Sequence, residues 1–168
     1  MKKPNKVIKP DLKLSVQFTV PAEDLTRQRI RGWVSQTLNL AWMHHHIDAN
    51  GLYLNLRFVD SAEGQTLNQQ FRQKNNATNV LTFAYGLDDD NTLTADVVIC
   101  VPVLVEEAQA QHKLFISHAA HLIIHGTLHA LGFDHIDEAE ANEMETLEKD
   151  ILARLKIADP YAISDKIQ

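Results

Sequence analysis

The sequence predicts an α+β fold, in which a single domain holds a central four-stranded mixed sheet covered by helices. Segments with the apolar alternation of strands occur only in the first hundred residues, mixed with helical segments, whereas helical periodicity alone continues from Pro102 onward. The chain has 168 residues, of which 45% are hydrophobic and 23% charged, the balance of a folded globular protein. We expect residues 1–168 to form one domain, with residues 1–11 as a loose basic lead-in.

The first three elements follow from the spacing of apolar side chains. Residues 12–20 alternate apolar and polar side chains, which predicts a half-buried strand. Residues 23–41 place apolar side chains three and four positions apart, as an amphipathic helix does. Residues 52–59 repeat the alternation of a strand, and Ser61 stands where the N-cap of a short helix reaching Phe71 is expected.

The second half of the chain begins with two more strands and continues with helices. Apolar runs at 80–85 and 95–101 flank the segment GLDDDNT, whose Gly and Asp residues favour a loop or hairpin connection. Helices are then predicted for residues 103–111, 114–133 and 137–155. The acidic segment of the last helix is interpreted as its solvated face.

Residues 114–133 contain no formally charged side chain and are about as long as a membrane span. Four histidines, a serine and a threonine in this stretch favour a buried central helix instead. The single Cys100 cannot form an intramolecular disulfide, and no apolar segment follows the basic N-terminus as in a secretory signal. We therefore expect a cytoplasmic protein without a membrane partner.

Charge is unevenly distributed along the chain. Residues 1–74 carry 11 basic and 6 acidic side chains, a net charge of +5, whereas residues 75–168 carry 5 and 16, a net charge of −11. A polyanion would be attracted to the first part and repelled by the second, although ordinary solvated surfaces would give the same counts.

The segment HGTLHALGFDH, residues 125–135, has the spacing of a metal site. His125 and His129 are four residues apart, so on a helix both imidazoles lie on one face. In a continuous helix His135 would lie about 15 Å from His125 along the axis. Gly132 can end the helix and allow the chain to turn back, so that His135 joins the other two.

Three imidazoles would hold one divalent ion and leave a coordination position open, as in catalytic zinc sites. Zinc is the expected ion, although nickel and copper also accept three imidazoles. The site would thus lie on a buried late helix and the turn after it. Asp134 is a candidate to orient a ligand imidazole through a hydrogen bond, and Asp134 or Cys100 could instead occupy the fourth position and make the site structural.

The remaining histidines have simpler interpretations. His118 and His121 continue the stripe along the same helix, where we expect them to pack or to support the ligands. Residues 44–46 are three consecutive histidines, whose side chains cannot converge on one ion from a regular element, so a surface cluster is expected. Buried histidines satisfied by backbone or carboxylate groups remain the alternative to a metal site.

The histidine spacing also matches the metzincin peptidase motif HExxHxxGxxH, in which the glutamate is the general base. Gly126 occupies the position of that glutamate here. A positioned acid–base group typically contributes about 10² to 10⁴-fold to the rate, so a peptidase without it would be severely impaired. A metallopeptidase is therefore the alternative rather than the preferred function.

Three segments together resemble the YbeY family of metal-dependent single-strand endoribonucleases. HGTLHALGFDH resembles the family signature HGxLHLxGYDH, FRQKNNATNVLTFAYG resembles YRxKDxPTDVLSFP, and ADVVIC resembles GDIxI, in the same order and at comparable spacing. The resemblance covers residues 52–155. The chain departs from it by Asn75 and Asn79 in place of acids and by four further substitutions: Ala77, Ala84, Thr82 and Ala95.

The resemblance implies an endoribonuclease that acts in maturation of 16S rRNA of the small ribosomal subunit and in ribosome quality control. It also implies that Arg72 is catalytic, and an arginine can hold a phosphodiester with two hydrogen bonds. Lys74 is a weaker candidate for a phosphate contact. RNA is the expected partner and DNA is not, while ribosomal proteins and an assembly GTPase stay open. A ribosome assembly factor with a structural metal is a third, non-catalytic hypothesis.

Overall fold

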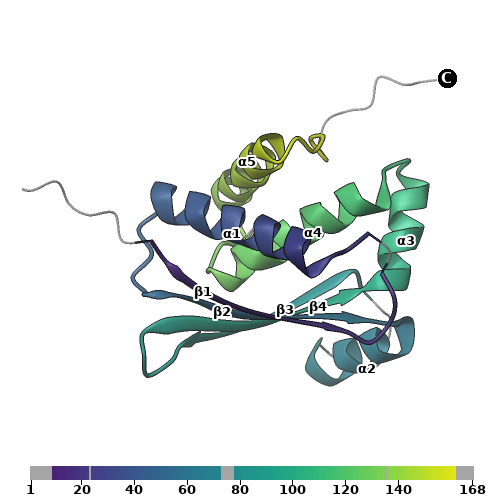
Figure 1. Ribbon diagram of the computed structural model, residues 1–168, viewed down its shortest axis with the longest axis horizontal. Coiled ribbons are helices and arrows are strands. Elements are labelled where there is room, and N and C mark those ends of the chain that lie inside the picture. Colours follow the sequence, from purple (N-terminus) through teal and green to yellow (C-terminus); the bar gives the residue numbers. More distant parts are fainter. Residues whose placement is uncertain (1–8, 23, 73–77, 135, 162–168) are drawn as a thin grey trace, which may run out of the picture.

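The structure is a computed structural model in which residues 9–22, 24–72, 78–134 and 136–161 are described. It confirms the α+β class and the four-stranded mixed sheet expected from the sequence. Helices cover both faces of this sheet unequally (Figure 1).

The sheet has the strand order β1-β2-β4-β3. Strands β1 (Asp11–Phe18), β2 (Gly51–Val59) and β4 (Thr92–Cys100) are mutually parallel, and β3 (Val80–Leu87) pairs antiparallel with β4. The expected hairpin between the third and fourth strands is therefore present. It places β3 at an edge of the sheet, where one side of its backbone has no partner strand among the described residues.

Four of the described helices lie on one side of the sheet, and α2 (Ser61–Arg72) lies on the other (Figure 1). Helix α4 (Phe115–Ala130) is central, since it contacts β3, β4 and the three other helices on its side of the sheet. Those three helices are α1 (Arg27–His44), α3 (Val101–Ala110) and α5 (Glu138–Arg154). Helix α4 is therefore the buried central helix that its lack of charge predicts.

Two helix starts differ from the sequence-based expectations. Helix α1 begins at Arg27 rather than residue 23, because the Thr26 side chain accepts a hydrogen bond from the Arg29 amide and caps the helix there. The expectation that Ser61 caps α2 was wrong. Asp60 takes that role, as its Oδ1 accepts a hydrogen bond from the Glu63 amide at 2.8 Å.

Helix α4 lies unusually close to β4 at Gly126. A Cβ atom added at Gly126 would be 2.8 Å from Cγ1 of Val97 and 3.5 Å from Cγ2 of Val80. Val97 is a fully buried, β-branched side chain with little freedom to move aside. The lack of a side chain at Gly126 thus sets the distance between α4 and the sheet.

Among the described residues, no helix combines the length and the apolar character needed to cross a membrane.

The close packing predicts that Gly126→Ala destabilises the fold. Overpacking a core typically costs about 1–3 kcal/mol, which exceeds the gain of up to about 1 kcal/mol that alanine offers over glycine in a helix. Chemical denaturation should therefore show a lower free energy of unfolding for Gly126→Ala. The matched control is Gly32→Ala in α1, where an added Cβ meets nothing within 4 Å.

Gly32→Ala should raise the free energy of unfolding by about 0.5–1 kcal/mol. Equal, stabilising effects of both substitutions would contradict the proposed close packing. Combining Gly126→Ala with Val97→Ala should cost less than the sum of the two single effects, because the smaller residue 97 makes room for the added methyl group.

Candidate metal centre

Helix α4 ends as the sequence predicts, at a glycine. The amide of Gly132 donates to the His129 carbonyl at 3.0 Å, and the amide of Phe133 donates to the Leu128 carbonyl at 3.0 Å. This pair of hydrogen bonds is a Schellman motif, which requires a positive φ at the glycine, and φ of Gly132 is 101°. The chain therefore turns sharply away from the helix axis directly after His129.

His125 and His129 direct their Nε2 atoms toward each other. The two nitrogens are 3.0 Å apart, and the rings meet edge to face with centroids 4.5 Å apart. Two imidazole nitrogens bound to one tetrahedral zinc ion would be roughly 3.3 Å apart, given bonds of about 2.0–2.1 Å. The spacing of the two ring nitrogens thus suits a shared ion.

These two histidines line a cleft of about 660 Å³. One wall is the edge strand β3 with the residue before it, and the other is the end of α4 with the turn that follows. The remaining lining residues are Asn79, Val80, Thr82, Ala84, Gly132, Phe133 and Asp134. The paired imidazoles are therefore open to a ligand from one side.

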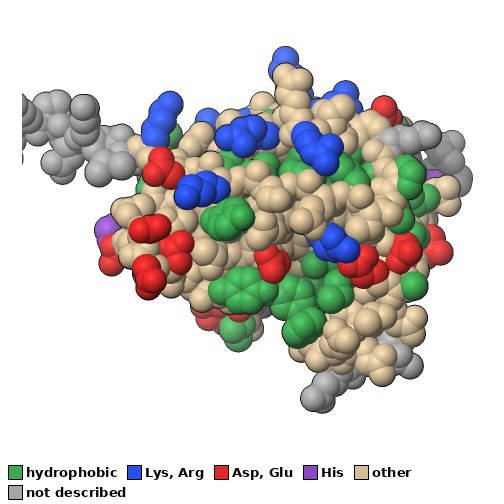
Figure 2. All heavy atoms as spheres, turned by 60° about the horizontal axis from the view of Figure 1, so that its bottom comes forward, with side chains coloured by type: hydrophobic (Ala, Val, Ile, Leu, Met, Phe, Trp, Pro, Cys, Tyr) green, Lys and Arg blue, Asp and Glu red, His purple; other side chains and the backbone are tan. Residues whose placement is uncertain are grey.

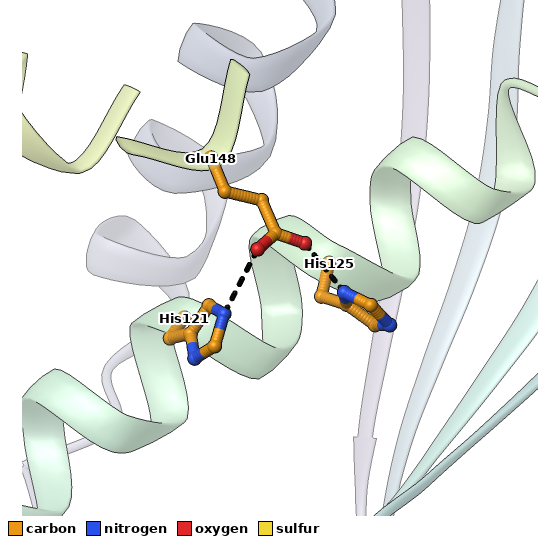
Figure 3. Close-up of side chains that lie close together, drawn as sticks. All are labelled: His121, His125 and Glu148. Atoms are coloured by element: carbon orange, nitrogen blue, oxygen red, sulfur yellow. Dashed lines mark hydrogen bonds and ion pairs between the residues drawn. The ribbon is translucent and has the colours of Figure 1, made fainter. Parts of the chain in front are cut away.

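On the other side, a buried carboxylate from α5 contacts the imidazoles. Oε1 of Glu148 is 2.5 Å from Nδ1 of His125, and its Oε2 is 3.0 Å from Nε2 of His121 (Figure 3). The hydroxyl of Tyr161 donates a further hydrogen bond to Oε2. Glu148 is fully buried, and these contacts stabilise its carboxylate.

The pKa values of this group follow from its contacts. Burial alone would raise the pKa of Glu148, but hydrogen bonds from His121, His125 and Tyr161 outweigh it and lower the pKa from 4.5 to about 2. For Tyr161, burial and the hydrogen bond to the Glu148 carboxylate both raise the pKa of the phenol. Glu148 is therefore ionised and Tyr161 is a hydrogen-bond donor at neutral pH.

Nitrogen and oxygen atoms of His121, His125 and Glu148 also lie within 4.8 Å of one another, so these residues could themselves surround an ion. Two observations favour hydrogen bonding instead. The 2.5 Å separation of His125 Nδ1 from Glu148 Oε1 is too short for two ligands of one tetrahedral ion. In addition, the Glu148 carboxylate already accepts a hydrogen bond from the Tyr161 hydroxyl. The cleft side of His125 is the better place for a metal.

The other residues expected from the sequence are only partly within the described structure. Arg72 is the last residue of α2, and its side chain is not described. Lys74 and His135 lie outside the described residues. Asp134 lines the cleft, but the carboxylate that contacts His125 on its Nδ1 side is that of Glu148.

Two of the remaining histidines, His118 and His45, are held by carboxylates. Nε2 of His118 is 3.1 Å from Oε1 of Glu107 in α3, and the same carboxylate accepts hydrogen bonds at 3.2 Å from the Asn79 amide. His45 caps α1 and pairs with Glu143 of α5 at 2.9 Å. Glu107 thus links the central helix to Asn79 in the wall of the cleft.

A second cleft, of about 490 Å³, lies on the face of the sheet that carries α2. Phe83 and Tyr85 of β3 line this second cleft. Thr82 and Ala84 line the cleft of His125 and His129 instead, because alternate side chains of a strand point to opposite faces. Asp96 accepts a hydrogen bond from the Tyr85 hydroxyl at 2.8 Å. Figure 2 shows the exposed hydrophobic side chains on this face of the molecule.

Comparison with known proteins identifies the family of the chain that forms this cleft. The sequence model described as Endoribonuclease YbeY matches residues 15–156. The chain belongs to the YbeY family. The matched residues of this YbeY-family protein include all of α4, the turn after it and α5.

Individual relatives match the YbeY-family chain over nearly their full length. It is 51% identical over 156 residues to the protein named Endoribonuclease YbeY of Bordetella avium, covering 93% of this chain and 97% of that one. The protein of the same name from Bordetella pertussis is 52% identical over 151 residues, covering 90% and 96%. The solution structure of TM1509 from Thermotoga maritima has the same fold, with a TM-score of 0.58, 19% identity and 92% coverage of this chain.

Sequence analysis missed Glu148 and Tyr161. The acidic segment of the last helix was interpreted as solvated, yet Glu148 is four residues after Met144 and three before Ile151, both buried. That spacing places Glu148 on the inward stripe of α5. A carboxylate on a buried stripe, opposite a helix rich in histidines, was the signal that could have identified it.

The Glu107 contact predicts that Asn79→Asp destabilises the protein. The new carboxylate would lie about as close to Glu107 as the amide does now, at 3.2 Å, and two like charges would replace a hydrogen bond. Thermal unfolding at pH 7 should show a lower Tm, and adding Glu107→Gln to Asn79→Asp should restore most of it. An unchanged Tm for Asn79→Asp would show that the contact contributes nothing.

Proposed function

We propose that this protein is a metal-dependent endoribonuclease that hydrolyses phosphodiester bonds of single-stranded RNA. The proposed ligands of one divalent ion, with zinc expected, are His125, His129 and His135. The observation that carries the proposal is the convergence of two Nε2 atoms, 3.0 Å apart, at a cleft in a chain of the YbeY family. Its relatives are named endoribonucleases.

A divalent ion at three imidazoles would supply a Lewis acid with an open position for water or a phosphate oxygen. The chain's own residues provide the surroundings. Glu148 holds His125 so that its Nε2 faces the cleft, and Asn79 is fixed in the cleft wall by Glu107. The cleft volume of about 660 Å³ is within the range of small-molecule sites and suits a nucleotide unit of an extended strand.

Arg72 is proposed to bind the scissile phosphate and stabilise negative charge as the bond breaks. A guanidinium can make two parallel hydrogen bonds to a phosphate, and its charge is permanent. Support comes from its place at the end of α2, seven residues before Asn79 of the cleft wall. Lys74 is proposed as a further phosphate contact and Asp134 as a support for the ligands.

Peptide hydrolysis is less well supported by the geometry. A metzincin-type glutamate at position 126 would have to fit where even a Cβ atom lies 2.8 Å from Val97. The close contact between α4 and β4 therefore leaves no room for that general base. A purely structural metal is disfavoured because the two nitrogens face a cleft rather than a closed core.

The biological setting is part of the same proposal. The RNA substrate is proposed to be 16S rRNA of the small ribosomal subunit, in its maturation and in ribosome quality control, in the cytoplasm. Ribosomal proteins or an assembly GTPase would then be protein partners.

The proposal predicts chelator-sensitive cleavage of single-stranded RNA without cleavage of casein. His129→Ala should lose the activity, because one of the converging nitrogens is removed. The measurement is the rate of cleavage of an end-labelled RNA before chelation, after chelation and after zinc is restored. Casein cleavage that is lost in His129→Ala would instead support the peptidase.

Arg72→Ala separates catalysis from assembly in the same assay. Removing one stabilising donor of a transition state typically costs about 10² to 10³-fold in rate, so cleavage should fall by that factor while metal content stays unchanged. The control is Arg31→Ala on the exposed face of α1, which should cleave at the wild-type rate. Ribosome binding without any metal-dependent cleavage by the wild type would favour the assembly factor.

A further inference from the structure

We propose that Glu148 is a positioning residue of the metal centre, and that Tyr161 from the segment after α5 holds it in place. This inference rests on the proposed metal site and deepens it. Glu148 does not touch the cleft itself, since it reaches the site through His125.

The Glu148 carboxylate lies in the interior, between α5 and α4. Glu148 has no exposed surface, although a buried carboxylate is costly unless it is fully paired. Three donors surround it: His121 and Tyr161 at one oxygen and His125 at the other. Because the buried carboxylate accepts hydrogen bonds from all three donors, it holds their side chains in one arrangement.

The contact with Glu148 also determines which nitrogen of His125 carries a proton. An ionised carboxylate can only accept hydrogen bonds, so at 2.5 Å it requires a proton on Nδ1 of His125. A neutral imidazole protonated on Nδ1 keeps its lone pair on Nε2. That atom is the one that faces His129 and the cleft. Glu148 therefore selects the form of His125 that can bind a metal there.

The segment after α5 positions Tyr161 beside Glu148. Beyond α5, the Ile157 amide donates to the Leu152 carbonyl at 2.8 Å, and Lys113 donates to the Pro160 carbonyl at 3.4 Å. The first contact ends α5, and the second joins the segment to the residue two positions before α4. The Tyr161 ring then lies edge to face with His121 of α4, at 5.5 Å between centroids. Tyr161 thereby closes the side of Glu148 that α4 leaves open.

The experiment measures zinc affinity, which does not depend on RNA cleavage. Glu148→Gln keeps the size of the side chain but removes its charge, and loss of such an outer partner typically weakens metal binding by 10 to 100-fold. Competition with a chromophoric chelator should show this loss. Asp150→Asn, an exposed acid in the same helix, is the matched control and should bind zinc like the wild type.

Tyr161→Phe keeps the ring and removes only the hydroxyl, so it should weaken zinc binding by less than Glu148→Gln does. Far-UV circular dichroism and the free energy of unfolding check that each variant is folded. Equal zinc affinity of wild type and a folded Glu148→Gln would overturn the inference. Absence of zinc binding by the wild type would instead refute the proposed metal site on which it rests.

A second measurement needs no variant. In the full-length protein freed of metal, nitrogen-15 NMR should show a proton on Nδ1 of His125, because the Glu148 carboxylate accepts a hydrogen bond from that atom. A His125 ring without a proton on Nδ1 would contradict the proposal even if Glu148→Gln fails to fold.

Discussion

The close approach of α4 to β4 at Gly126 is the constraint on which the rest of the site depends. Because residue 126 has no side chain, the helix lies directly on Val97 and is fixed in depth and rotation. The face of α4 that carries His125 and His129 is then directed toward the edge strand β3, and both histidines line the cleft between them. A larger residue would push the helix outward and move both imidazoles with it.

The same helix carries the buried imidazole of His118 and the partly buried imidazoles of His121 and His125, and carboxylates from the neighbouring helices pair with all three. Glu107 of α3 pairs with His118, and Glu148 of α5 pairs with His121 and His125. Part of the acidity of the second half of the chain therefore serves to pair with histidines, through the buried Glu148 and the partly exposed Glu107. The charge counts alone suggested either a solvated surface or a field that repels polyanions, and this structure adds a third use for those acids.

The local features of the fold could be predicted from sequence because they rest on periodicity and glycine. Alternation identified the first two strands and apolar runs the other two, and Gly132 identified the end of α4. Helix starts were predicted less well, since Ser61 was the expected cap of α2 and the neighbouring Asp60 provides it. Backbone hydrogen bonding decides such a choice, and it cannot be read from residue type alone.

The site could be predicted only where its residues are close in sequence. His125 and His129 are one helical turn apart, so their convergence follows from the helix. Glu148 and Tyr161 are brought to the metal site by tertiary packing. Because the residues around them in the sequence are acidic or polar, the sequence pattern did not indicate that they are part of the site. The resemblance to the YbeY family did not identify Glu148 or Tyr161 either. The motifs that carry it end at His135, before α5 begins.

The most direct test of the account is a crystal structure of the zinc-loaded protein, with anomalous scattering used to locate the ion. The account predicts one peak in the cleft, about 2.0–2.1 Å from Nε2 of both His125 and His129. It further predicts that Nδ1 of His125 still contacts Glu148. An ion located instead among His121, His125 Nδ1 and Glu148 would contradict it.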